Sequence, residues 1–251
     1  MPAVDASPAP VLELAAVRVE FDGRIVLDGV DLQVHQGQCL ALLGEDGSGR
    51  STLCHVLNRT EAVTSGEVRL DGRAVATSGT ALATLRADVA LIPSHAYLGT
   101  GRTLLDECAA GPVRVRGQDP ESAREAARFA LEQVGLGHRL DASTDDVDDH
   151  ERPRVALARA LALEPRVLLL DDPTAGLARP DTARFHAALT RVVRDPAVTA
   201  VLVDPHLDRV RQLADRVVVL DAGQVVEDTS CEAFFAGPRS DAGRRVAVTS
   251  R

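Results

Sequence analysis

The feature that most constrains the fold of this chain is a glycine-rich segment, GEDGSGRST, at residues 44–52. It follows an apolar stretch, residues 37–43, that is typical of a strand, and it precedes a helix-like segment, residues 51–57. Glycines let consecutive backbone N–H groups turn inward around an anion, and the N-terminus of the following helix adds its dipole. The order of strand, loop and helix predicts a phosphate-binding loop, with a purely structural glycine turn as the alternative.

The residues predicted to bind a nucleotide in this loop are Gly44, Gly47, Ser48, Gly49, Arg50, Ser51 and Thr52. Ser51 is placed where its hydroxyl can hold Mg²⁺, and Thr52 is within reach of a phosphate. A second feature supports this interpretation, because the run VLLLD at 167–171 puts Asp171 at the end of a strand that is apolar throughout. We therefore predict a P-loop NTPase fold that binds ATP and holds Mg²⁺ with Ser51 and, through water, Asp171.

Strand-like and helical patterns alternate along the rest of the chain. Strands are predicted at residues 12–20, 25–34, 65–72, 89–92, 199–203 and 217–223, and helices within 104–140 and at 154–163, 180–194 and 206–214. This alternation predicts an α/β fold with a largely parallel sheet. Within these elements, the dipeptide Asp28-Gly29 predicts a turn.

Two further details follow from the same patterns. In the helix over ESAREAARFALEQVGL, the apolar residues Ala126, Phe129, Ala130 and Val134 are expected to pack inward. A dipeptide Asp71-Gly72 is expected to close a hairpin after residues 65–70.

The composition narrows the classes of partner. A net charge of −9 with 2% aromatic residues is a poor match to nucleic-acid binding. No apolar run approaches the roughly 18 residues of a membrane span, and we see no basic start followed by an apolar stretch, so no signal peptide is expected. All 28 basic residues are arginine. This bias bears on the phosphate loop, where a lysine is the usual cation.

Several long stretches resemble the nucleotide-binding domain of ABC transporters. They are VLDGVDLQVHQGQCLALLGEDGSGRSTL, LNRTEAVTSGEVRLDG, RPRVALARALALEPRVLLLDDPTAGL and LADRVVVLDAGQVVED. The resemblance covers residues 11–237 and implies a RecA-like core, an antiparallel β subdomain and an α-helical subdomain inserted at about residues 95–155. Residues 1–10 are then expected to be a disordered tail, and residues 238–251 a loose C-terminal tail.

The resemblance also implies a mode of action. In the family, two such domains sandwich two ATP molecules, each between the P-loop of one chain and the LSGGQ helix of the other, and their closure drives a membrane subunit. The segment GPVRVRG and the stretch FFAGPRSDAGRR resemble the subgroup that energises importers of polar amino acids. The implied partners are a membrane-spanning permease and a second nucleotide-binding domain, in a homodimer or heterodimer at the cytoplasmic face of the cell membrane. Phe21 falls where an aromatic ring stacks on adenine, and a core phenylalanine is the alternative.

The sequence departs from the family pattern at the positions that act on the nucleotide. Arg50 stands in place of the phosphate-loop lysine, and a planar guanidinium does not nest in the loop as an ammonium does. Asp172 occupies the position of the catalytic glutamate with a side chain one methylene shorter. Ser94 replaces the glutamine of the Q-loop, which is too long a side chain for serine to imitate.

The coupling motifs change as well. Residues 147–151, VDDHE, align with LSGGQ, so that acids face the partner's phosphates, which they should repel. Solvated acids that complement the helix dipole, or a metal site formed with His150, are the alternatives. Pro205 replaces the switch histidine, and His206 follows on the other face of an extended segment. Ala178 replaces the aspartate of the D-loop.

These departures leave the structural residues in place while the catalytic ones change. We therefore expect an ATP-binding subunit of a polar amino-acid importer that binds nucleotide weakly and hydrolyses it poorly or not at all, with Asp172 as a weakened catalytic residue. A non-catalytic regulatory or scaffold protein that pairs with an active homologue is the alternative. An ATPase that tolerates the substitutions is a third reading.

Overall fold

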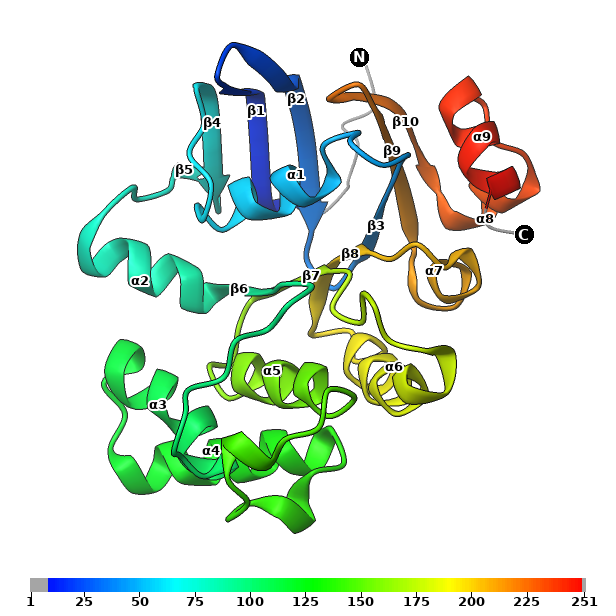
Figure 1. Ribbon diagram of the computed structural model, residues 1–251. Coiled ribbons are helices and arrows are strands. Elements are labelled where there is room, and N and C mark those ends of the chain that lie inside the picture. Colours follow the sequence, from blue (N-terminus) through cyan, green and yellow to red (C-terminus); the bar gives the residue numbers. More distant parts are fainter. Residues whose placement is uncertain (1–8, 250–251) are drawn as a thin grey trace.

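A computed structural model describes residues 9–249, apart from the side chains of residues 179–181 and 249 (Figure 1). The strands are β1 (Pro10–Phe21), β2 (Arg24–His35), β3 (Cys39–Leu43), β4 (Ser65–Leu70), β5 (Arg73–Ala74), β6 (Val89–Ile92), β7 (Val167–Asp171), β8 (Thr199–Val203), β9 (Arg216–Asp221) and β10 (Gln224–Ser230). The helices are α1 (Arg50–Leu57), α2 (Gly79–Asp88), α3 (Leu104–Arg116), α4 (Pro120–Gln133), α5 (Arg152–Leu161), α6 (Arg179–Val193), α7 (Leu207–Leu213), α8 (Cys231–Ala236) and α9 (Asp241–Thr249), with short 3₁₀ helices η1 (Gly137–Arg139) and η2 (Thr144–Asp146).

The larger sheet has six strands in the order β10-β9-β3-β8-β7-β6. All neighbouring pairs are parallel except the hairpin of β9 and β10. Every residue of β3, β7 and β8 is buried, in agreement with their continuous apolar sequences. Because parallel strands end at one edge of the sheet, the loops after β3, β7 and β8 meet there, and this edge is where such folds bind ligands.

The larger sheet is covered on both faces. Val167 and Leu169 of β7 pack in a cluster with α1 and the smaller sheet. Leu168 and Leu170 point the other way and pack with α4, α5 and α6. This alternation is what the two-residue repeat of a strand requires. Both faces of β7 are therefore packed, which fixes its end, Asp171, next to Ser51 after the phosphate loop.

The smaller sheet is antiparallel, with the order β2-β1-β4-β5. The predicted turn at Asp28-Gly29 is wrong, because β2 runs through both residues. The β1–β2 register shifts there, and Gly29 has φ 67°, so the dipeptide lies in a β-bulge, which also uses a positive-φ glycine. The hairpin turn is at Asp22-Gly23 instead, while the turn at Asp71-Gly72 is as predicted.

Helices α3, α4 and α5 lie in the stretch between β6 and β7 and form a group of their own beside the larger sheet (Figure 1). The predicted inward face of α4 is partly wrong. Ala130 and Val134 are buried, but Phe129 is 62% exposed. The buried stripe is made by Ala123, Ala127, Ala130 and Leu131. Small alanines let α4 lie close to its neighbours, and this leaves the bulky ring of Phe129 outside.

The C-terminal segment is not the loose tail that the sequence suggested. Residues 241–249 form α9, and its Ala242 and Val246 pack in a cluster with Phe234 of α8. Glu227 fixes the approach to the helix by accepting hydrogen bonds from the backbone N–H groups of Arg239 and Ser240, both at 2.9 Å. At the other end, residues 1–8 of the expected N-terminal tail lie outside the described residues. Within the described chain, no helix has the length and apolarity that crossing a membrane requires.

Candidate nucleotide site

The phosphate loop, residues 44–49, joins β3 to α1 in a conformation that favours glycine. Gly44, Gly47 and Gly49 have φ values of 154°, 80° and 103°. A Cβ on Gly44 would lie 2.5 Å from the carbonyl oxygen of Leu220 and closer still to Ser48 Oγ, whereas nothing lies within 4 Å of a Cβ built on Gly47. The loop is therefore tightly packed on its inner side and open at Gly47.

Two observations fit an anion held by this loop. Ser48 Oγ is buried and has no hydrogen-bond partner among the described residues. The first N–H groups of α1, which begins at Arg50, have no partner within the helix. Both are polar groups that a bound phosphate can satisfy.

Ser51 and Asp171, the predicted metal-binding pair, lie together. Ser51 Oγ donates a hydrogen bond of 2.8 Å to Asp171 Oδ1, and Asp171 is 5% exposed. His55 lies one helical turn beyond Ser51, with its Nε2 3.4 Å from Asp171 Oδ2, but this nitrogen has no hydrogen-bond partner among the described residues. Sequence reasoning missed His55, although its spacing from Ser51 puts both residues on one helical face. Hard oxygen ligands completed by phosphate and water suit Mg²⁺, so the pair fits this ion.

Arg50 pairs with a residue of its own loop. Its guanidinium Nη2 lies 3.1 Å from Asp46 Oδ1, and the Arg50 side chain is 17% exposed while that of Asp46 is fully exposed. The cation expected to meet the phosphates is therefore already beside a carboxylate. This contact was not predicted, although Asp46 lies four residues before Arg50.

Asp172 follows Asp171 in a strained and crowded position. Its φ is 42°, and its N–H donates a 2.9 Å hydrogen bond to the carbonyl of Val203. Burial, and then the charge of Asp204, raise the pKa of Asp172 to about 6, while Arg209 opposes the shift. Asp204 is 3% exposed and binds Arg209 through two hydrogen bonds of 2.8 Å. A second carboxylate and its own cation thus lie near Asp172, and sequence reasoning identified neither.

Pro205 and His206 follow Asp204 at the start of α7. The N–H of His206 donates a 2.8 Å hydrogen bond to Asp204 Oδ1, which fixes the turn into the helix. Burial, and then the positive charge of Arg209, lower the pKa of His186 on α6 to about 4, while Asp204 opposes the shift.

The start of α5 is filled by the chain's own side chains. Glu151, at the N-cap position, is 7% exposed and forms ion pairs with Arg139 and Arg154. Asp145 accepts a 3.0 Å hydrogen bond from the N–H of Gly101, and Asp149 is exposed. Some acids of this segment therefore bind other residues of the chain, and others are exposed to solvent. The side chains that the structure describes include no group of three His, Cys, Asp or Glu residues that could bind a metal, so the structure gives no site at His150.

The remaining predicted residues are Ser94, Phe21 and Ala178. Ser94 contacts His95, with Oγ 3.3 Å from Nδ1, and both line a cleft together with Asp149, Arg152 and Gly176. The Q-loop position is thereby brought next to the segment aligned with LSGGQ. Phe21 ends β1 and is 42% exposed, so it is not a core residue. Ala178 is the N-cap residue of α6.

Comparison with known proteins identifies relatives along the whole chain. A family model described as ABC transporter matches residues 27–175. The glutamate transport ATP-binding protein GluA of Corynebacterium glutamicum is 33% identical over 231 residues, covering 92% of this chain and 95% of the relative. The glutamine transport ATP-binding protein GlnQ of Escherichia coli is 32% identical over 233 residues, with coverage of 92% and 95%.

A solved structure supports the fold. That of cbiO1 from Clostridium perfringens, described as part of the ABC transporter complex cbiONQ, superposes with a TM-score of 0.79 at 23% identity. The match covers 97% of this chain and 100% of that one. At this identity the likeness concerns the fold alone.

Proposed function

Because this chain belongs to the ABC transporter family, we propose that it is the ATP-binding subunit of an importer for polar amino acids, and that it binds Mg-ATP weakly and hydrolyses it poorly or not at all. The relatives named for glutamate and glutamine transport support the class of solute. One observation carries the second part: Ser51 and Asp171 are in contact below the glycine loop, while Arg50 and Asp172 are engaged or crowded by neighbouring charges.

Nucleotide binding is assigned to the phosphate loop and the first turn of α1. Backbone N–H groups from Gly47 to Thr52 surround the phosphates, and Ser51 and Asp171 hold Mg²⁺, which neutralises phosphate charge when bound. The partly exposed ring of Phe21 is assigned to adenine. Thr52 also lies in the first turn of α1, where its hydroxyl can reach a phosphate.

Weak affinity is assigned to Arg50. To meet a phosphate, its guanidinium must give up Asp46, and the Asp46 carboxylate then adds negative charge next to the polyanion. A charge-assisted hydrogen bond contributes about 1.5 to 3 kcal/mol, so losing part of one weakens binding appreciably. The loop otherwise keeps the glycines that its conformation needs.

Slow hydrolysis is assigned to the residues around Asp172. The carboxylate that polarises the attacking water is one methylene shorter than glutamate, and a displacement of about 1 Å costs roughly a hundredfold in rate. Pro205 has no side-chain donor to meet the γ-phosphate. Arg209 is bound by Asp204, so its charge is not free to replace that donor.

The partners follow from the same assignment. We propose that the chain docks on a membrane-spanning permease at the cytoplasmic face of the membrane and pairs with a second ATP-binding domain. The start of α5, closed by Glu151 and flanked by exposed acids, is a poor surface for a partner's γ-phosphate. A homodimer therefore has both nucleotide sites weakened in the same way.

Calorimetric titration with Mg-ATP tests the proposal. The native chain is expected to bind saturably but weakly, and Arg50→Lys to bind more tightly, because an ammonium nests in the loop as a compact charge. Arg194→Lys, an exposed substitution at the end of α6, is the matched control and should leave affinity unchanged. Absence of binding by both the native chain and Arg50→Lys contradicts the proposal and favours a nucleotide-independent scaffold.

A further inference from the structure

A cavity of about 450 Å³ lies away from the phosphate loop, between the end of α4, η1, the first turn of α5 and α6. None of residues 44–52 lines it. The lining residues with ionisable side chains are His138, Glu151, Arg154, Arg184 and Arg191. Three arginines thus share one cavity with a single carboxylate, in a chain whose net charge is −9. We call this cavity the arginine cavity.

The single carboxylate that lines the arginine cavity, that of Glu151, already has partners within the chain. Glu151 forms ion pairs with Arg139 and Arg154 and also accepts a hydrogen bond from the N–H of Asp148. Among the described residues, Arg184 and Arg191 form no ion pair, and the Arg191 side chain donates one hydrogen bond, to the carbonyl of Ala187 in its own helix. The cavity therefore carries positive charge that the described part of the protein does not neutralise.

The environment of Arg154 is a second observation that points to excess positive charge in the arginine cavity. It is 3% exposed, and its Nε is buried without a hydrogen-bond partner in the described chain. Burial lowers the pKa of Arg154, and the charges of Arg184 and Arg139 lower it further, against the opposing effect of Glu151. A buried guanidinium beside two others is costly unless an anion is near.

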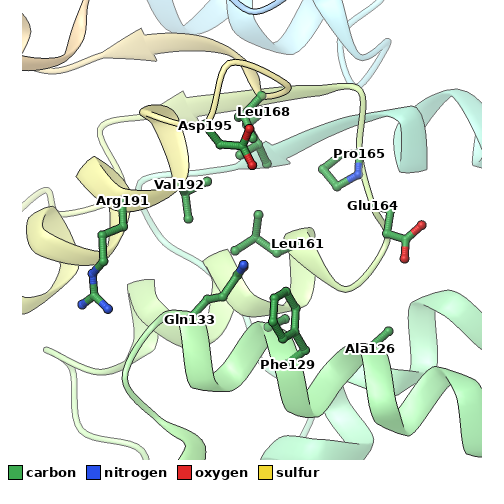
Figure 2. A pocket seen from close by; sticks show the side chains of 12 residues that line it. Ala126, Phe129, Gln133, Leu161, Glu164, Pro165, Leu168, Arg191, Val192 and Asp195 are labelled. Atoms are coloured by element: carbon green, nitrogen blue, oxygen red, sulfur yellow. The ribbon is translucent and has the colours of Figure 1, made fainter.

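The spacing of the two exposed arginines defines the shape of a ligand. Arg184 and Arg191 are seven residues apart on α6, hence on one face and about 10 Å apart along the axis. Figure 2 shows Arg191 at the margin of a neighbouring apolar groove, with its guanidinium apart from Leu161 and Phe129. The groove and the cavity share Arg191, but the apolar side chains of the groove offer nothing to an anion.

We propose that the arginine cavity binds a small molecule with two oxyanion groups, phosphate or carboxylate, one at Arg184 and one at Arg191. Guanidinium groups bind such oxyanions with paired, charge-assisted hydrogen bonds. The volume falls within the range of about 300–1,000 Å³ typical of ligand pockets. Because the cavity joins the first turn of α5 to α6, the ligand ties the helical layer to the helices of the larger sheet.

Calorimetry on the full chain tests this with two probes, inorganic pyrophosphate and glutarate. At least one is expected to bind saturably, and the double variant Arg184→Gln/Arg191→Gln should lose about tenfold or more in affinity. Arg128→Gln/Arg194→Gln is the matched control, because it removes the same charge from exposed arginines outside the cavity. Pyrophosphate binding alone identifies a phosphorylated ligand, and glutarate binding alone a dicarboxylate.

The phosphate loop is excluded as the source of the signal by Arg50→Ala, which should leave binding at the arginine cavity unchanged. A fall in pyrophosphate affinity in Arg50→Ala, with full binding in Arg184→Gln/Arg191→Gln, contradicts the proposal. So does equal loss in the two double variants, or no saturable binding of either probe. Because pyrophosphate can also bind at the phosphate loop, only the part of its binding that Arg184→Gln/Arg191→Gln removes is assigned to the arginine cavity.

Discussion

The N-termini of α1 and α5 differ in how the chain treats the partial positive charge at a helix start. α1 follows the glycine loop and has no acidic residue in its first turn. α5 follows Glu151, a buried carboxylate held by Arg139 and Arg154. The start of α1 is open to an anion from outside the chain. The start of α5 has a carboxylate of the chain beside it, although this carboxylate pairs with arginines and makes no capping hydrogen bond to the helix.

This contrast shows that anion binding at a helix start depends on the few residues before it. In the family resemblance, each nucleotide lies between a P-loop and the signature helix of a partner. Here the P-loop half keeps its conformation, with Ser51 against Asp171. The signature half has Glu151 where the resemblance expects the last residue of LSGGQ. On the proposed function, the chain has a half-site that holds a nucleotide but does not provide the half-site that completes another.

The largest effect is expected from Glu151→Ala, which breaks the α5 side of the comparison. It leaves Arg154 and Arg139 without their carboxylate, and breaking a buried pair in this way costs about 3 kcal/mol or more. Chemical denaturation measures the loss of unfolding free energy. Asp149→Ala, two residues earlier and exposed, should change stability by less than about 1 kcal/mol. Equal effects of the two substitutions would show that Glu151 is no more than a surface acid.

The next largest effect is expected from Gly44→Ala, which disrupts the phosphate loop in front of α1. Its φ of 154° and the nearby carbonyl of Leu220 leave no room for a methyl group, so we expect a loss of about 2 kcal/mol and weakened Mg-ATP binding. Gly47→Ala serves as the control, because its Cβ enters open space and only the positive φ opposes it, at about 1 kcal/mol. Thermal unfolding compares the two, and an equally stable Gly44→Ala contradicts the loop geometry.

Asp46→Asn tests whether Asp46 competes with bound phosphate for Arg50. It releases Arg50 from its loop partner, and we expect the affinity for Mg-ATP to rise about fivefold, the equivalent of about 1 kcal/mol. Glu45→Gln removes the same charge from the same loop but from a residue that pairs with Arg245. If both substitutions raise the affinity equally, the effect is general charge repulsion and Asp46 does not compete for Arg50.

The smallest effect concerns Asp172, a partly buried carboxylate that lies near a second carboxylate, Asp204. Its pKa is raised to about 6, so the folded state holds the proton more tightly than the unfolded state does. Stability from this group is therefore lost as the pH rises from about 4 through 6. Asp172→Asn should match the native chain at pH 4 and exceed its stability at pH 7, by about 1 kcal/mol after allowance for solvent. A difference that does not change with pH would contradict this shift.

Much of the fold was predictable because local sequence and tertiary environment agree. β3 and β7 are apolar throughout and fully buried, and the glycine loop between β3 and α1 admits few conformations. The predictions failed where one sequence pattern is compatible with two structures. Asp28-Gly29 is compatible with a turn and with a bulge. The pattern of α4 is compatible with more than one buried face, and packing against its neighbours buries the alanines and not Phe129.

The candidate site divides in the same way. Ser51 and Asp171 were predictable, because each lies at a fixed place next to a strand of known direction. The contacts that modify the site were not, because they join residues brought together by side-chain packing: Asp46 with Arg50, Asp204 with Arg209, and Glu151 with Arg139. No periodic pattern in the sequence predicts such pairs. Acidic residues at motif positions that are usually uncharged, such as residues 147–151, are a reason to look for them.

Steady-state ATP hydrolysis by the native chain, beside Asp171→Ala, tests the central claim most directly. Asp171→Ala removes the buried carboxylate at the end of β7 and serves as the background. The account predicts that the native chain, at concentrations of Mg-ATP that saturate its binding, turns over at a rate close to that background. Robust hydrolysis by the native chain that Asp171→Ala abolishes would contradict it, and would make this chain an ATPase that works with Arg50, Asp172 and Pro205 in place.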